Sequence, residues 1–224
     1  MGLILLVAAG CAHHQEAKLD DSGLARLNNN QMGPVDDARL DLGRAQDMAS
    51  KARANEADAK ARVEVAKSER EVGEAQAKRA AAQRDLLKKQ YADKDALAQS
   101  DADVSAAQDA IHAEEAKIAY LNQHVAACAA ERNAAEAHVL TQEAVVEQSK
   151  YQAMQQGGAP QTASINPAQL DSRLAEARKR EAEAQKQAID RRTQAKELYD
   201  RWARVDPKAR PPQGIQPAAP TAHQ

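Results

Sequence analysis

Apolar and small residues recur every seven positions through the middle of this chain, the pattern of helices that pack along one another. In the first half the repeating positions are Val35, Leu42, Ala49, Glu56, Val63, Arg70, Ala77, Arg84 and Tyr91, accompanied by Ala38, Ala45, Ala52, Ala59, Ala66, Gly73, Ala80 and Leu87. In the second half they are Leu97, Val104, Ile111, Ile118, Val125, Arg132, Val139 and Val146, accompanied by Ser100, Ala107, Glu114, Leu121, Cys128, Ala135, Gln142 and Ser149. Because small residues are frequent at these positions, two such helices can approach each other closely.

The two repeats differ in phase by one residue, and the break falls between Tyr91 and Leu97. The helical stretches on its two sides are of nearly equal length. This predicts a long, alanine-rich antiparallel hairpin over 34–156 with its tip near 91–96, where Asp93 or Asp95 caps the returning helix. The predicted turn contains neither glycine nor proline, so one continuous rod is the alternative.

Prolines mark where the hairpin begins and ends. Pro34 suits the first position of a helix, so residues 11–33 before it are expected to form a polar linker. A segment that contains glycine and proline ends the hairpin and predicts a loop over 157–166.

A third helix is predicted over 167–205, with Asn166 as its cap and Pro167 in its first turn. Its repeating positions are Leu170, Leu174, Ala177, Glu181, Ala184, Ala188, Arg191, Ala195, Leu198 and Trp202. This helix is long enough to fold back along part of the hairpin. The proline-rich tail over 206–224 is expected to be extended and disordered.

The composition fits an all-α chain of long helices and excludes an ordinary globular core. Among 224 residues there are no phenylalanines, one tryptophan and four tyrosines, while 29% are charged and the mean hydropathy is −0.71. Alanine supplies much of the apolar fraction, and its small area contributes little at about 25 cal/mol per Å² buried. A net charge of −2 and a pI near 6.3 give no basic excess, so nucleic acid is not expected as a partner.

Cys11 directly follows a short apolar run whose last residue, Gly10, is small. This N-terminus resembles the lipobox of bacterial lipoproteins, in which the chain is cut before the cysteine and the cysteine carries a lipid. The resemblance implies that residues 1–10 are a signal peptide, incomplete because no Lys or Arg opens it, and that Cys11 anchors the protein in a membrane. Ala12 after the cysteine implies the outer membrane, with the protein facing the periplasm. A chance apolar start on a cytosolic helical protein is the alternative.

A second resemblance lies in the stretch Leu86-Leu87-Lys88-Lys89-Gln90-Tyr91-Ala92-Asp93-Lys94, between the two alanine-rich repeats. It is similar to the hairpin tip of periplasmic adaptor (membrane fusion) proteins of efflux and secretion systems. That resemblance implies that Arg84, Leu87 and Asp93 contact an outer-membrane channel, although Asp93 stands near where the family carries serine. Adaptors also flank the hairpin with strands, and no segment of this sequence has a strand pattern.

Catalytic and cofactor motifs are absent from the sequence, which has no glycine-rich phosphate loop, no serine nucleophile elbow and no paired-cysteine zinc pattern. The chain is therefore expected to be neither an enzyme nor a cofactor binder. His124, Cys128, Glu131 and His138 share one helical face and leave a metal-binding or redox-sensing protein as an alternative. A buried thiol beside surface histidines accounts for the same spacing.

Together these features predict a lipid-anchored periplasmic coiled-coil protein that acts as a structural spacer, scaffold or partner-binding module of the cell envelope. Protein partners are expected along the helical faces, and self-association of the chain stays open.

The replacement Cys11→Ser is expected to abolish lipid attachment, because the lipid is carried on the thiol. Expressed with its native upstream region, the wild-type protein should partition into detergent and incorporate labelled palmitate, and the variant should do neither. If the variant behaves as the wild type in both assays, the lipoprotein prediction is wrong.

Overall fold

The computed structural model describes residues 19–91 and 93–210, and every regular element within them is a helix. In chain order these are the 3₁₀ helix η1 (Asp21–Arg26), the long helices α1 (Asn29–Lys89) and α2 (Lys94–Gln156), the 3₁₀ helix η2 (Pro160–Ser164), and α3 (Pro167–Val205). The predicted all-α fold is confirmed. The predicted signal peptide, Cys11 and most of the proline-rich tail lie outside the described residues.

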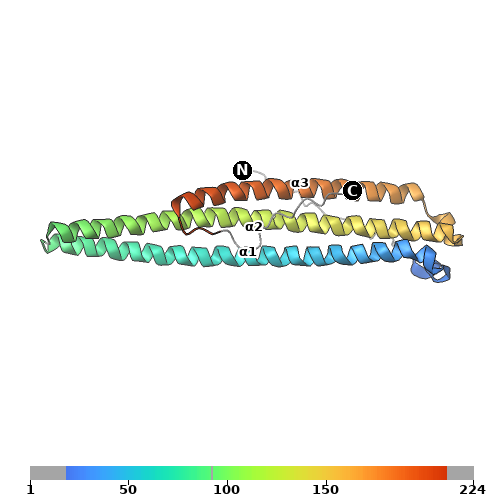
Figure 1. The fold of residues 1–224 in the computed structure, drawn as a ribbon, viewed down its shortest axis with the longest axis horizontal. Coiled ribbons are helices and arrows are strands. Elements are labelled where there is room, and N and C mark those ends of the chain that lie inside the picture. The colour runs from blue at the N-terminus through green and yellow to red at the C-terminus, as the bar shows by residue number, and fades with distance from the viewer. Residues whose placement is uncertain (1–18, 92, 211–224) are drawn as a thin grey trace, which may run out of the picture.

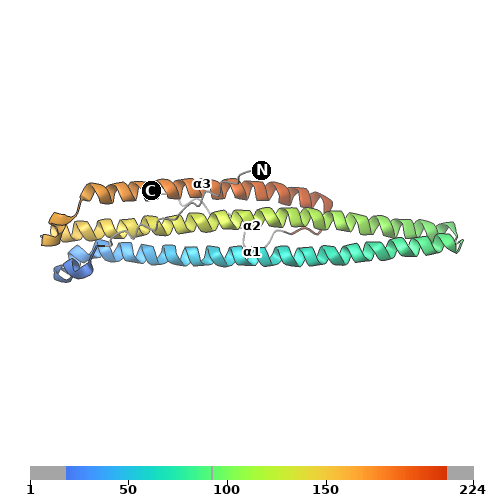
Figure 2. The same cartoon turned by 180° about the vertical axis from the view of Figure 1, so that it is seen from behind.

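The helices α1 and α2 form an antiparallel hairpin, and α3 packs along α2 (Figures 1 and 2). The 61 residues of α1 correspond to roughly 90 Å at about 1.5 Å per residue. The chain reverses between Gln90 and Asp93, so the continuous-rod alternative is wrong. We call the end that carries this turn the tip and the other end the open end. Since α3 starts at the open end and has only 39 residues, it leaves the tip uncovered (Figure 1).

The start of α1 differs from the sequence prediction. The helix begins at Asn29 instead of Pro34, because Asn28 and Gln31 form a capping box that satisfies the free N–H groups of the first turn. Pro34 therefore lies inside the helix, where it has no N–H to donate to the preceding turn. The third helix has the predicted bounds, and the Asn166 side chain accepts a hydrogen bond from the backbone N–H of Ala168 at its start.

Part of the predicted polar linker packs on the hairpin. Leu24 in η1 is buried in a small core at the open end together with Val35 and Met154. Gly23 allows this approach, because a β-carbon there would lie only 2.5 Å from the sulfur of Met154. Lys150, which is 8% exposed, pairs with Asp21 at 2.8 Å and ties the same segment to α2. The linker prediction is thus wrong for residues 19–28, whose leucines find apolar partners.

The repeating positions of α1 face α2 as predicted over the open-end half of the hairpin. Most of them are buried, namely Val35, Ala38, Ala45, Ala49, Glu56, Ala59, Val63 and Ala66, while Leu42 and Ala52 are half-buried. Glu56 is tolerated there because it pairs with Lys60 at 2.7 Å and with Arg132 of α2 at 2.9 Å. Nowhere in the described ranges is a helix both long and apolar enough to cross a membrane.

The helix α2 has a second packing face, which the sequence analysis did not identify. Its positions, seven residues apart, are Tyr120, Ala127, Ala134 and Thr141, all buried except Ala134, which is half-buried. Tyr120 contacts Trp202 of α3. On α3, Leu170, Leu174, Ala188, Ala195 and Trp202 are buried as predicted. Arg191, which was placed at a repeating position, is exposed, and Arg192 instead turns toward α2 and pairs with Glu131 at 2.7 Å. α2 is therefore the central helix of the assembly.

Most of the aromatic side chains of the protein gather where α3 ends. Tyr120 stacks on Trp202 with ring centroids 5.7 Å apart, and Tyr199 meets Tyr120 edge-on at 5.5 Å. This cluster packs on Val63 of α1, so it is a place where all three long helices meet. The Tyr120 hydroxyl and the Trp202 indole N–H are buried without a hydrogen-bond partner. Ring packing and apolar burial therefore hold this end of α3.

The replacement Trp202→Ala is expected to release the end of α3, because it removes the largest side chain of the cluster. Large-to-small changes of buried aromatic residues lower stability by about 3–5 kcal/mol. Hydrogen exchange should show faster exchange of the backbone amides in the last turns of α3, while α1 near the open end stays protected. Trp202→Phe, which keeps a ring, should show a much smaller change. Unchanged exchange in Trp202→Ala would contradict the proposed attachment.

Candidate functional site at the hairpin tip

Tyr91 is the most exceptional residue of the tip. Its backbone has φ = +52°, in the left-handed region that favours glycine, and it is the only described non-glycine residue with a positive φ. Its side chain is 96% exposed. The sequence analysis placed Tyr91 at the end of the first packing row, and that placement is wrong because the chain turns there. Because the Tyr91 ring is exposed, it makes no packing contact that would offset the energetic cost of the strained backbone.

The three residues predicted to contact a channel have roles within the hairpin. The Arg84 guanidinium pairs with Asp101 of α2 at 2.8 Å, and Leu87 is half-buried between the helices. Asp93 is the N-cap of α2, since its carboxylate accepts a hydrogen bond from the backbone N–H of Ala96 at 2.8 Å. These contacts show that Arg84, Leu87 and Asp93 help to hold the two helices of the hairpin together at the turn. That the same residues contact a partner stays a prediction.

The side chains that the tip presents to solvent are different ones. Leu86 is 56% exposed, and together with Tyr91 it places two large apolar groups near the turn. Lys88, Lys89 and Lys94 lie close to them in the sequence and are exposed. The sequence carried one signal for this surface: Leu86 is a large apolar residue outside the repeating positions. The exposure of Tyr91 could not be predicted without locating the turn to the residue.

The two helices carry opposite charge near the tip. The last three turns or so of α1 contain Lys78, Arg79, Arg84, Lys88 and Lys89, with Asp85 as the one acidic residue. The first part of α2 contains Asp95, Asp101, Asp103 and Asp109 and no Lys or Arg after Lys94. The attraction between these two segments supports the hairpin where its apolar contacts are few.

The candidate metal or redox cluster is divided by the packing of α3. The Cys128 sulfur lies 3.8 Å from the nearer ring nitrogen of His124. Glu131 and His138 are engaged elsewhere, because Glu131 pairs with Arg192 and His138 lies 2.9 Å from Glu181 of α3. No group of three or more His, Cys, Asp or Glu side chains with the geometry of a metal site occurs within 19–91 and 93–210.

The Cys128 thiol is also poorly suited to redox chemistry. Its side chain is buried, and burial together with the nearby Glu131 carboxylate raises its pKa to about 11. A thiol with such a pKa carries very little thiolate at neutral pH, and the thiolate is the reactive form. Burial likewise lowers the pKa of His124, so this imidazole is mainly neutral at pH 7. The pair is an uncharged part of the packing.

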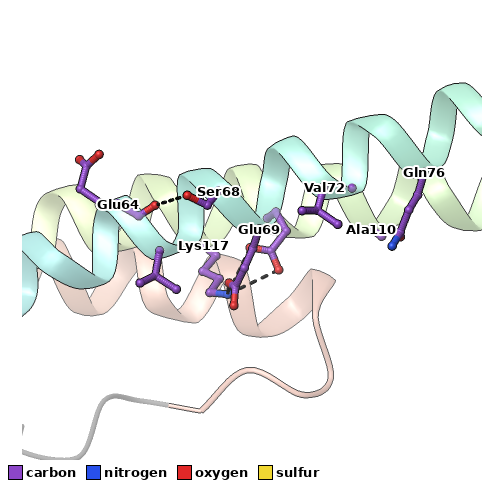
Figure 3. A pocket seen from close by; sticks show the side chains of 10 residues that line it. Glu64, Ser68, Glu69, Val72, Gln76, Ala110 and Lys117 are labelled. Atoms are coloured by element: carbon purple, nitrogen blue, oxygen red, sulfur yellow. Dashed lines mark hydrogen bonds and ion pairs between the residues drawn. The ribbon is translucent and has the colours of Figure 1, made fainter.

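A hollow of about 730 Å³ lies between α1 and α2 beside the end of α3 and extends past it toward the tip (Figure 3). It is open to solvent, and Val72, Gln76 and Ala110 form its wall toward the tip. At its other end Lys117 pairs with Glu69. The polar side-chain groups of the hollow are thus carboxylates, one amine, an amide and the Ser68 hydroxyl, which donates a hydrogen bond to the backbone carbonyl of Glu64 at 3.2 Å and not to a base.

The chain matches no protein-family model, no curated protein and no solved structure.

The replacement Tyr91→Gly is expected to raise the free energy of unfolding by up to about 1 kcal/mol, because glycine adopts a positive φ without the steric penalty. Little is lost in exchange, since the tyrosine ring makes no packing contact. Thermal unfolding followed by circular dichroism measures the change. The matched control is Gln90→Gly, whose φ of −86° is ordinary, and there glycine should destabilise the protein. Equal destabilisation by both changes would show that Tyr91 is not left-handed in solution.

Proposed function

We propose that this protein is a lipid-anchored spacer of the cell envelope that presents a protein-binding tip at a fixed distance from its anchor. The observation that carries the proposal is Tyr91, an aromatic side chain fully exposed on a strained backbone at the end of a long hairpin. Strained residues that the fold does not need are concentrated at functional sites. Exposed tyrosines are also enriched among the residues that dominate protein–protein binding.

The length and the continuous helices of the hairpin suit a spacer. Its helices run roughly 90 Å, at about 1.5 Å per residue, without an interruption between the open end and the tip. At the open end, η1 and α3 both pack on α2 and stiffen the rod. Capping at Asn28 and Asp93 fixes the starts of the two long helices, so the distance between the ends is well defined.

The anchor would lie at the open end. Leu19, the first described residue, hydrogen bonds through its backbone N–H to Glu147 near the end of α2. Only a short segment separates Leu19 from Cys11, and it spans at most about 28 Å when fully extended. A lipid on Cys11 therefore keeps the open end near the membrane surface and allows the tip to reach far into the periplasm. This part of the proposal rests on the lipobox resemblance.

Docking on an outer-membrane channel, as periplasmic adaptors do, is the second candidate function. The pair of exposed apolar residues at a hairpin tip, Leu86 and Tyr91, favours it. Both candidate functions place the binding site at the tip. They differ in the identity of the partner. The described residues supply none of the strands that flank the hairpin in adaptors.

We expect a photoreactive amino acid at Tyr91 to form a discrete covalent adduct with one protein in cells that make the full-length protein. The same amino acid at Ile189, which is 63% exposed on α3, should form none. The test is specific for the tip because both positions are exposed apolar residues far apart along the rod. Mass spectrometry of the adduct then separates a channel from another envelope protein.

A second variant excludes chance collisions at the tip. With the photoreactive group at Lys88, Leu86→Ala should reduce the adduct several-fold, because it removes one of the two apolar contacts. Absence of any adduct from Tyr91 or Lys88, or equal adducts from Ile189, would contradict tip binding.

A further inference from the structure

The chain turns back on itself directly after α3. The carboxylate of Asp206 accepts a hydrogen bond from the backbone N–H of Lys208 at 2.9 Å, and the backbone carbonyl of Asp206 accepts one from the N–H of Ala209 at 3.0 Å. Pro207 occupies the second position of this β-turn, where its fixed φ is favourable. The turn directs the chain back toward the open end and away from the tip (Figures 1 and 3).

The turn also brings the chain onto the hairpin. Ala209 is half-buried and packs on the cluster where the three long helices meet, to which α1 contributes Val63 and α3 contributes Trp202. This differs from the disordered tail expected from residue 206 onward. Residues 206–210 are held by the turn and by this contact, so the tail starts out along the side of the hairpin.

The side of α1 next to this contact carries Met48 farther toward the open end. Arg62 marks that side, because it lies near His124, the ring that stacks on Tyr120 of the cluster. Burial lowers the pKa of His124, and the charge of Arg62 adds to the shift. Met48 precedes Arg62 by two seven-residue repeats, so it faces the same way. The Met48 side chain is 56% exposed, which leaves about half of its surface open to a further segment.

We propose that residues 211–215 continue along this side of α1 and place Ile215 on Met48. The distances agree. Val63 and Met48 are 15 residues apart on α1, which corresponds to about 22 Å at about 1.5 Å per residue. Ile215 follows Ala209 by six residues, which span about 19 Å at about 3.1 Å per residue in an extended proline-rich conformation. The reach of the two side chains covers the difference between these lengths.

The sequence of the tail suits this contact. Pro211 and Pro212 open the segment and have few conformations to lose, so ordering them costs less than ordering other residues. Ile215 is the one large aliphatic side chain after Val205. No residue from 211 to 222 is charged, so no charge of the tail loses its water on docking. Because the segment is already held at Ala209, it docks at a high effective concentration and needs only a small contact.

The docked tail acts as a clasp between α3 and α1. In the described part of the chain these two helices make few direct contacts with each other, and α2 lies between them over most of the length of α3. The clasp connects the end of α3 to α1 and opposes separation of its last turns, in addition to the aromatic cluster. It depends neither on the lipid anchor nor on binding at the tip.

Pairs of cysteines test the position of the tail in the full chain with Cys11→Ser, in which Cys128 is buried and unreactive. Under mild oxidation, Met48→Cys with Ile215→Cys should form an intramolecular disulfide at least about tenfold faster than Gln46→Cys with Ile215→Cys. Gln46 is the matched control, because it is exposed at nearly the same height and lies about 200° around α1 from Met48. Similar rates for the two pairs would mean that the tail moves freely and would overturn the proposal.

Hydrogen exchange tests whether the tail holds α3. Ile215→Ser should make the backbone amides in the last turns of α3 exchange several-fold faster, because it removes the apolar contact with Met48. Thr221→Ala, beyond the proposed contact, should leave their exchange unchanged, and circular dichroism confirms that both variants stay helical. Wild-type exchange in Ile215→Ser, or an equal change in both variants, would overturn the proposal.

Discussion

The scarcity of large apolar side chains governs this structure. A chain without phenylalanine and with one tryptophan cannot assemble a compact core, so its stability must come from long contacts between helices. Alanine at the contact positions lets the backbones approach closely, but each residue buries little area. The consequence is an extended molecule in which each small contribution is repeated along α1 and α2. Where larger side chains do occur, as at Tyr120 and Trp202, they pack the end of α3 against α2.

The sequence allowed the hairpin and the third helix to be predicted, because a seven-residue repeat and its change of phase are direct consequences of helix geometry. The cap at Asn166 was likewise predicted from residue type and position, whereas the cap of α2 was narrowed to Asp93 or Asp95, of which the structure has Asp93. The start of α1 was not predicted, since the capping box at Asn28 outweighs the usual preference of Pro34 for a first turn. The packing of residues 19–28 was missed because three isolated leucines in a polar segment show no periodicity.

The site was predicted less well than the fold, for a physical reason. Arg84, Leu87 and Asp93 were chosen by resemblance, and each has a structural role that depends on its distance from the opposite helix. Tyr91 and Leu86 are exposed because of a turn whose position cannot be fixed to one residue from a repeat. The second face of α2 was also hidden, since alanines that pack against α3 look the same in the sequence as alanines that face water. Three-dimensional contacts, absent from any one-dimensional pattern, distinguish them.

The end of α3 partway along the hairpin has a mechanical consequence. The bending stiffness of a bundle rises steeply with the number of helices that resist deformation together, so the three-helix half behaves as a shaft and the two-helix half as a more compliant extension. Lateral force on the tip concentrates curvature near Trp202, where the cross-section changes. The aromatic cluster thus lies at the base of the more compliant half, where that half bends most. A rod built in this way keeps its base straight while its end adjusts to the position of whatever it meets.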